Sequence, residues 1–153
     1  MNRSLERWRF IRRYWRLQGE TLFFLVWCYI ALRSVAFKRL APRLGVAMQE
    51  TPTALAPVHE AIARDVRLMV RIFAAKLPWT SSCLVRAMAA RHLLHRRGLP
   101  CTLYLGVNRD QPPLRAHAWL RSGVVCVTGA AGLEAYEAVS WFGSGGKTLA
   151  RPH

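Results

Sequence analysis

The sequence predicts an α+β fold, with helices in the first two thirds of the chain and an antiparallel sheet in the last third. Up to about residue 97, apolar residues recur at steps of three and four, which is the period of a helix. After Pro100 the pattern changes to short runs of β-forming residues separated by turn residues. Helices followed by strands are typical of α+β domains. A chain of 153 residues, 52% of them hydrophobic, is long enough to bury a core.

Residues 1–48 are predicted to form a basic helical region that packs on the rest of the chain, residues 49–153. Gly19 is a candidate break in its first helix. The segment 22–32 is apolar all round, and such a segment is usually buried against another element. We therefore favour packing over a separate helical subdomain. Before Gly19, six arginines interleave with apolar residues, at positions 3, 7, 9, 12, 13 and 16.

Two further helices are predicted in the middle of the chain. Residues 58–76 carry apolar side chains at helical spacing, and Pro78 ends that helix. The next helix begins near Ser82, whose hydroxyl is a preferred N-cap group, and it runs to Arg97. Gly98 then stands where a helix C-terminus favours glycine.

Three strands follow, in an antiparallel arrangement. Residues 101–107, 117–120 and 124–127 are rich in β-forming residues, and a tight turn at Ser122-Gly123 joins the last two. We assign a short helix to residues 133–142, and we expect the last ten residues to be loose.

The net charge of +15 is the most unusual property of the composition. A field of that sign attracts nucleic acid, an anionic membrane or an acidic protein. Residues 22–32 are too few to span a bilayer, which needs about 20 apolar residues, and no clear signal-peptide cleavage site follows them. We therefore expect a cytoplasmic protein whose four cysteines are free thiols. Contact of the first segment with a membrane surface stays open but is not expected.

Cys83 is the first candidate catalytic residue, because it opens a predicted helix. The start of a helix offers free N–H groups and the positive end of the helix dipole, which favour a thiolate nucleophile and can hold an oxyanion. The competing interpretation is a structural cysteine. We expect the other cysteines, at 28, 101 and 126, to pack in the interior.

His117 is the second candidate, since it begins a predicted strand after a polar loop. A neutral imidazole near a thiol can take its proton and later return it to a leaving amine. A cysteine at a helix start with a histidine on a later strand is the papain-type arrangement. His92 and His95 share a helix face, but neighbouring arginines would repel a cation, so we predict no metal site.

Four stretches together resemble the lasso-peptide leader peptidases, the protease component of the lasso-peptide processing B protein within the transglutaminase-like superfamily. They are Pro-Trp-Thr-Ser-Ser-Cys-Leu-Val-Arg-Ala-Met-Ala from residue 78, Leu-Leu-His-Arg-Arg-Gly-Leu-Pro from 93, Leu-Gly-Val from 105, and Ala-His-Ala-Trp from 116. The resemblance covers about residues 50–142. It implies a papain-like or transglutaminase-like cysteine peptidase core, with Cys83 as nucleophile and His117 as base.

The resemblance also implies a function and partners. Such enzymes remove the leader from a ribosomally made precursor peptide, after a leader with threonine in its penultimate position. A separate cyclase then uses ATP to close a macrolactam. The basic helical first 50 residues do not resemble the recognition-element domain that binds leaders, so a separate protein is expected to supply it. Cleavage itself needs no cofactor or metal.

One departure from the family concerns the third catalytic residue, usually an aspartate that follows the histidine. Here that neighbourhood reads Val-Thr-Gly-Ala from residue 127. Thr128, Glu134, Glu137 or a backbone carbonyl stay open as the group that orients His117. A Cys–His pair without a carboxylate would work at reduced efficiency.

Two other functions compete with peptide cleavage. The same Cys–His pair would support transglutaminase-type acyl transfer to an amine, which an amine adduct would reveal. Alternatively, the arginines at 3–16 would make the protein a basic module that binds nucleic acid or anionic membrane. That module would bind with a steep salt dependence and would not need Cys83. We expect no nucleic-acid function.

Overall fold

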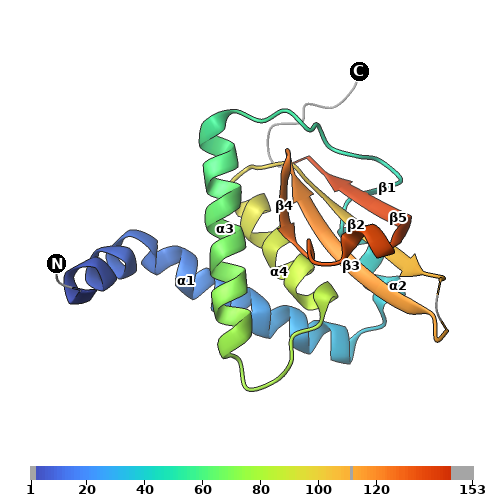
Figure 1. The fold of residues 1–153 in the computed structure, drawn as a ribbon, viewed down its shortest axis with the longest axis horizontal. Coiled ribbons are helices and arrows are strands. Elements are labelled where there is room, and N and C mark those ends of the chain that lie inside the picture. The colour runs from blue at the N-terminus through green and yellow to red at the C-terminus, as the bar shows by residue number, and fades with distance from the viewer. Residues whose placement is uncertain (1–2, 111, 146–153) are drawn as a thin grey trace.

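The computed structural model describes residues 3–110 and 112–145. Helices α3 (Pro57–Lys76) and α4 (Cys83–Arg96) pack against an antiparallel sheet, and helix α1 (Arg3–Ser34) packs on these two helices (Figure 1), so the α+β prediction is confirmed. Helix α4 lies at the centre, because it contacts the sheet as well as α1 and α3. Most of the last ten residues, which we expected to be loose, lie outside the described residues.

Helix α1 (Arg3–Ser34) is one continuous helix, so the predicted break at Gly19 is wrong. A glycine inside a helix costs only about 1 kcal/mol relative to alanine. That cost is small beside the free energy gained by burying Leu17, before Gly19, and Leu25 and Cys28, after it, where α1 packs against α3 and α4.

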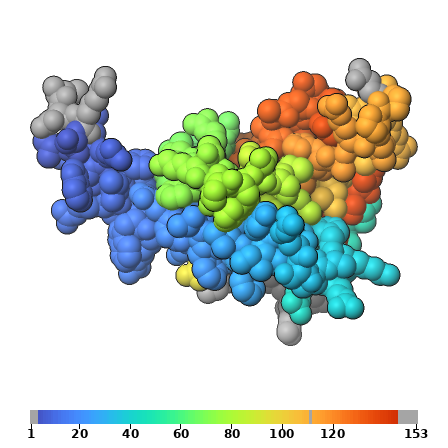
Figure 2. Space-filling model, turned by 90° about the horizontal axis from the view of Figure 1, so that it is seen from below, coloured from blue at the N-terminus to red at the C-terminus, as the bar shows by residue number. Residues whose placement is uncertain are grey.

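Only one face of the segment 22–32 is buried, although the sequence is apolar all round. The opposite face of α1, which we call its outer face, stays exposed. Its apolar side chains are Leu5, Trp8, Ile11, Trp15, Leu22, Phe23, Trp27 and Ile30. In Figure 2, α1 runs along one face of the molecule, and its N-terminal half extends beyond the other helices and the sheet.

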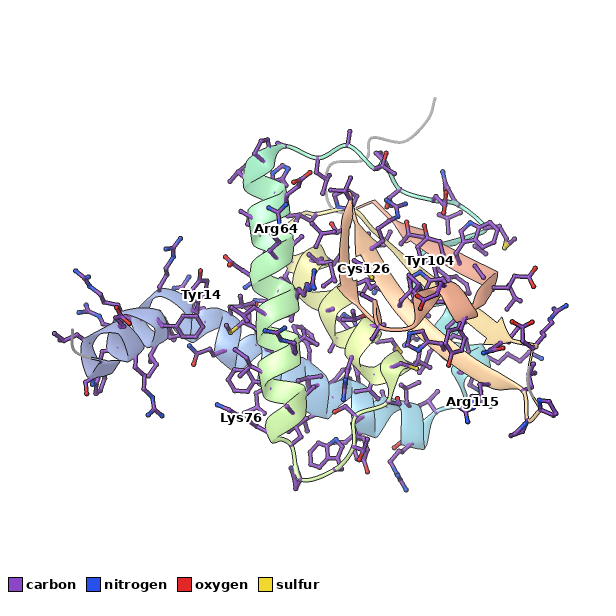
Figure 3. All side chains as sticks on the ribbon, viewed as in Figure 1. Tyr14, Arg64, Lys76, Tyr104, Arg115 and Cys126 are labelled. Atoms are coloured by element: carbon purple, nitrogen blue, oxygen red, sulfur yellow. The ribbon has the colours of Figure 1, made fainter. Side chains whose placement is uncertain are left out.

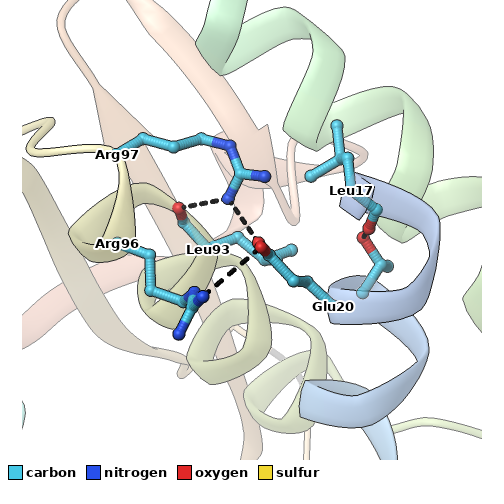
Figure 4. A network of polar contacts seen from close by, with 6 residues as sticks. Leu17, Glu20, Leu93, Arg96 and Arg97 are labelled. Atoms are coloured by element: carbon cyan, nitrogen blue, oxygen red, sulfur yellow. Dashed lines mark hydrogen bonds and ion pairs between the residues drawn. The ribbon is translucent and has the colours of Figure 1, made fainter. Parts of the chain in front are cut away.

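Polar contacts fasten α1 and the segment after it to α4. Glu20 accepts hydrogen bonds from Arg97 at 2.8 Å and from Arg96 at 3.5 Å (Figure 4). Beyond α1 come α2 (Phe37–Leu40) and a 3₁₀ turn (Ala41–Arg43), which ends beside α4. There the buried Arg91 donates to the carbonyl oxygens of Leu44 and Arg43, at 2.6 and 2.8 Å. The division of the chain at residue 48 stays a prediction.

The two middle helices match their predicted bounds. Helix α3 spans Pro57–Lys76 and α4 spans Cys83–Arg96. Ser82 caps α4, since its hydroxyl oxygen accepts a hydrogen bond from the Val85 N–H at 3.2 Å. Gly98 follows α4 with a φ of 71°, the left-handed conformation expected of a glycine after a helix.

The sheet has five strands in the order β1-β5-β2-β3-β4, and every neighbouring pair is antiparallel. The strands are β1 (Val46–Ala47), β2 (Cys101–Asn108), β3 (Arg115–Ser122), β4 (Val125–Thr128) and β5 (Glu137–Ser144). The three predicted strands therefore exist and pair as expected.

The helix predicted at residues 133–142 is wrong. Only a 3₁₀ turn, Leu133–Ala135, forms there. Residues 137–142 belong to β5, which pairs with β2 from Cys101 to Val107. Val139, Trp141 and Phe142 are strong β formers, and the pairing satisfies backbone groups of β2 that would otherwise lie at a sheet edge. Among the described residues, no helix is long and apolar enough to cross a membrane.

Candidate active site

Cys83 is the first residue of α4 and is half-buried. Ser82 caps the helix through the Val85 N–H, so the N–H groups of Cys83 and Leu84 have no partner within the helix. Free N–H groups at the positive end of a helix dipole stabilise negative charge beside them. The thiol therefore stands where a thiolate, and later an oxyanion, would be stabilised.

His117 lies on β3 with one ring nitrogen already engaged. Its Nε2 is 2.8 Å from the carbonyl oxygen of Gly129, just after β4. A carbonyl oxygen only accepts, so Nε2 carries the hydrogen and Nδ1 is left as the basic nitrogen. The ring also lies against Tyr136 and Trp119, with centroids 4.8 and 6.0 Å away. These contacts fix both the tautomer and the orientation of the imidazole.

The two candidate residues line one cavity of about 410 Å³. Its walls come from α3, the start of α4, β3, β4 and the loop after β4, and Figure 3 labels Cys126, a β4 residue among them. The lining residues are Arg67, Val70, Arg71, Ser81, Cys83, Arg86, His117, Cys126, Val127, Thr128, Gly129, Ala130 and Ala131. Cys83 and His117, which the sequence analysis proposed as a pair, lie 34 positions apart in the chain but line the same cavity. Their catalytic roles stay a prediction.

Of the groups left open for orienting His117, a backbone carbonyl, that of Gly129, lies within hydrogen-bond distance of its ring. Glu134 and Glu137 are both exposed, and neither lines the cavity. Thr128 does line it, but its buried hydroxyl has no hydrogen-bond partner among the described residues. A backbone carbonyl carries no residue signature, which is why the sequence left this position open.

Gly129 is the sequence signal for this arrangement. Its φ is 77°, and a Cβ there would stand 2.6 Å from the Ala118 oxygen and 2.7 Å from Trp119 Cβ. Only glycine fits this close approach, which brings the carbonyl to the imidazole.

Burial raises the pKa of three of the four cysteine thiols, those of Cys28, Cys101 and Cys126. Burial raises the pKa of Cys28 and of Cys101 to about 12, so these two thiols are inert at neutral pH. Cys126 was predicted to pack, but it is half-buried and lines the same cavity as Cys83. Burial raises its pKa as well, and its thiol donates a hydrogen bond to the Thr128 oxygen at 3.3 Å. Cys126 is therefore the natural control for Cys83.

His92 has a packing role in this structure. Its ring stacks on Phe24 of α1 at 5.0 Å. Burial, together with the charges of Arg91 and His95, lowers the pKa of His92 to about 4. The residues that the structure describes include no group of three or more His, Cys, Asp or Glu side chains placed to hold a metal ion.

Comparison with known families gives one match. The model of the transglutaminase-like superfamily matches residues 25–140, which is more than half of the chain. The protein therefore belongs to the transglutaminase-like superfamily. No curated protein and no solved structure gives a significant match. Membership supports activity of the cysteine-peptidase or acyltransferase type, and the matched region contains both Cys83 and His117.

Proposed function

We propose that this protein is a cysteine peptidase that removes the leader from a ribosomally made lasso-peptide precursor before macrolactam closure. The observation that carries the proposal is the shared cavity, in which Cys83 opens α4 and His117 is oriented through Gly129. The specific substrate rests on the resemblance of the sequence around these residues to the lasso-peptide leader peptidases.

The proposed reaction has two steps. First, Nδ1 of His117 takes the thiol proton, and the Cys83 sulfur attacks the carbonyl carbon at the leader–core junction. The N–H groups at the start of α4 hold the oxyanion, and the imidazolium returns its proton to the departing core amine. Second, His117 takes a proton from water, the hydroxide attacks the thioester, and the leader leaves as a carboxylic acid while the thiol is restored. No metal or cofactor takes part; ATP is required only by the separate cyclase.

A partner protein is part of the proposal. The outer face of α1 presents tryptophans between exposed arginines, which include Arg9, Arg12 and Arg16. Aromatic side chains and arginines are the residues that protein interfaces favour. We assign this face to a leader-binding recognition-element protein with an acidic surface, in the cytoplasm. Nucleic-acid or membrane binding through the same arginines is the alternative.

Mass spectrometry of a cleavage reaction tests the proposal. Precursor peptide and recognition-element protein are incubated with the wild-type protein and with Cys83→Ala, His117→Ala and Cys126→Ala. We expect wild type and Cys126→Ala to release an intact core peptide, whereas the other two fail although circular dichroism shows them folded. Cleavage by Cys83→Ala at the wild-type rate would remove the proposal, and an amine adduct in place of the free leader would favour acyl transfer.

A further inference from the structure

Three arginines line the cavity beside Cys83. Arg67 and Arg71 stand four residues apart on α3 and so share one face of that helix, whereas Arg86 lies one turn after Cys83 on α4. None of the described residues that line the cavity is acidic. Among the described residues, the ion pairs of the protein join Glu60 to Arg64 and Glu20 to Arg96 and Arg97, so none of them neutralises the three cavity arginines.

Two buried hydroxyl groups in the same wall also lack partners. Ser81 is 3% exposed and Thr128 is 8% exposed, and both line the cavity. Within the described part of the chain, neither hydroxyl oxygen makes a hydrogen bond, and the buried Nε of Arg86 has no acceptor. A buried polar group without a partner destabilises the protein, because it has lost its hydrogen bonds to water and gained none in return. Such groups gathered in one cavity indicate that a ligand supplies the missing partner.

The chemistry of these groups defines that ligand. Guanidinium groups only donate hydrogen bonds, and a hydroxyl can donate one, so the ligand must offer several acceptor oxygens. Three positive charges with no described counter-ion favour a ligand with negative charge. A carboxylate has both properties, and its two oxygens match the fork of a guanidinium.

We infer that this wall of the cavity is a subsite for an acidic side chain, Asp or Glu, that the peptide substrate carries close to its scissile bond. The inference rests on the proposed function, because it places the carboxylate beside the carbonyl that Cys83 attacks. Arg86 and the two hydroxyls contact the carboxylate, while Arg67 and Arg71 supply charge from α3. The subsite thus selects substrates by an acidic residue near the cut, in addition to the leader.

A binding experiment tests the subsite without catalysis. The probe is a series of capped hexapeptides of alanine, each with one glutamate at a different position and each with a matched glutamine peptide. They are titrated into ¹⁵N-labelled Cys83→Ala protein and followed by NMR shifts of backbone amides and arginine Nε–H groups. A charge-assisted hydrogen bond is about twice as strong as a neutral one, so one glutamate position should bind about tenfold tighter than its glutamine counterpart.

Substitutions then locate the preference. Arg86→Gln, and separately Arg67→Gln with Arg71→Gln, should reduce the preference to about twofold or less. Arg64→Gln should leave it unchanged, because Arg64 lies on α3 but pairs with Glu60 and does not line the cavity. Equal binding of glutamate and glutamine peptides at every position overturns the inference, and so does a preference that survives the cavity substitutions.

Two comparisons distinguish the peptide subsite from a site for free anions and from the proposed peptidase function. Sodium acetate at the same concentration should bind at least tenfold more weakly than the best glutamate peptide; equal affinity would mean that the wall binds free anions, which overturns the peptide subsite. The cleavage assay is independent of the titration. If the wild-type protein does not cleave the precursor but still prefers glutamate peptides, the proposed peptidase function is refuted and the carboxylate site remains.

Discussion

Two groups of arginines in this protein, one in the cavity and one on α1, have different surroundings. In the cavity, Arg67, Arg71 and Arg86 stand beside buried hydroxyls and a half-buried cysteine, in a wall assembled from α3, α4 and β4. On α1, the arginines are exposed and alternate with exposed tryptophans; Arg16 lies over the ring of Trp15 at 5.4 Å. The first surface is enclosed and suits a small charged group. The second is open and suits a large partner.

The difference teaches that the net charge of +15 does not act as one uniform field, because arginines stand in different surroundings. Composition alone predicts one positive field and leaves nucleic acid, membrane and protein as equal partners. Burial divides that field, because the cavity arginines stand beside the buried hydroxyls of Ser81 and Thr128, which have no partner among the described residues, whereas the arginines on the outer face of α1 are exposed. Each surface can therefore be changed without the other.

The largest expected effect comes from the enclosed surface. Gly129→Ala would place a Cβ against Ala118 and Trp119 and push away the carbonyl that holds His117. We expect a loss of about 100-fold in kcat/KM, since a displacement of about 1 Å of a catalytic group can cost that much. Gly132→Ala is the control, because its φ of 67° is similar but nothing lies within 4 Å of its Cβ. Equal activity of the two variants would contradict the role of the Gly129 carbonyl.

The open surface should give the next largest effect. Trp15→Ala should lower cleavage about tenfold in the presence of the recognition-element protein, because buried tryptophans contribute strongly at interfaces. Cleavage of a short peptide without that partner should not change. Val124→Ala, another exposed apolar position away from α1, serves as the control. Loss of both activities would show that Trp15 supports the fold, and an unchanged affinity for the partner would remove α1 from the interface.

The stacking of His92 of α4 on Phe24 of α1 predicts an acid sensitivity. The pKa of His92 is lowered to about 4 from an ordinary value of 6.5, so the unfolded chain binds a proton more readily than the folded one. The contribution of His92 to the free energy of unfolding is fully present above pH 6.5 and is lost as the pH falls toward 4. Urea denaturation at pH 7 and pH 4.5 should show a smaller loss for His92→Phe than for wild type. His59→Phe, at an exposed position, should retain the full loss.

The smallest effect concerns the buried hydroxyl of Thr128. Thr128→Val keeps the shape of the side chain and removes the polar group without a partner. We expect the free energy of unfolding to rise by up to about 1 kcal/mol, while the preference for acidic peptides falls. Chemical denaturation measures the first change and NMR titration the second. A loss of stability would mean that the hydroxyl already has a partner, such as water, in the free protein.

The sequence predicted the elements that position the site because their signals are local. The N-cap at Ser82, the glycine at 98 and the strand around His117 each depend on a few neighbouring residues. Strand β5 was missed because its place depends on pairing with β2. The cavity residues Arg67 and Cys126 were missed because only the packing of α3 against β4 brings them to Cys83. Similarly, the helix continues through Gly19 because of contacts made by distant residues.

Selective alkylation of the cysteines tests the central claim most directly. Native protein is treated with limiting iodoacetamide at pH 7, and peptide mapping by mass spectrometry locates the modified thiol while cleavage is measured on the same sample. We predict that Cys83 reacts first, that activity falls in proportion, and that Cys126 reacts more slowly because burial raises its pKa. First modification of Cys126, or full activity after complete modification of Cys83, would contradict the assignment of Cys83 as the nucleophile.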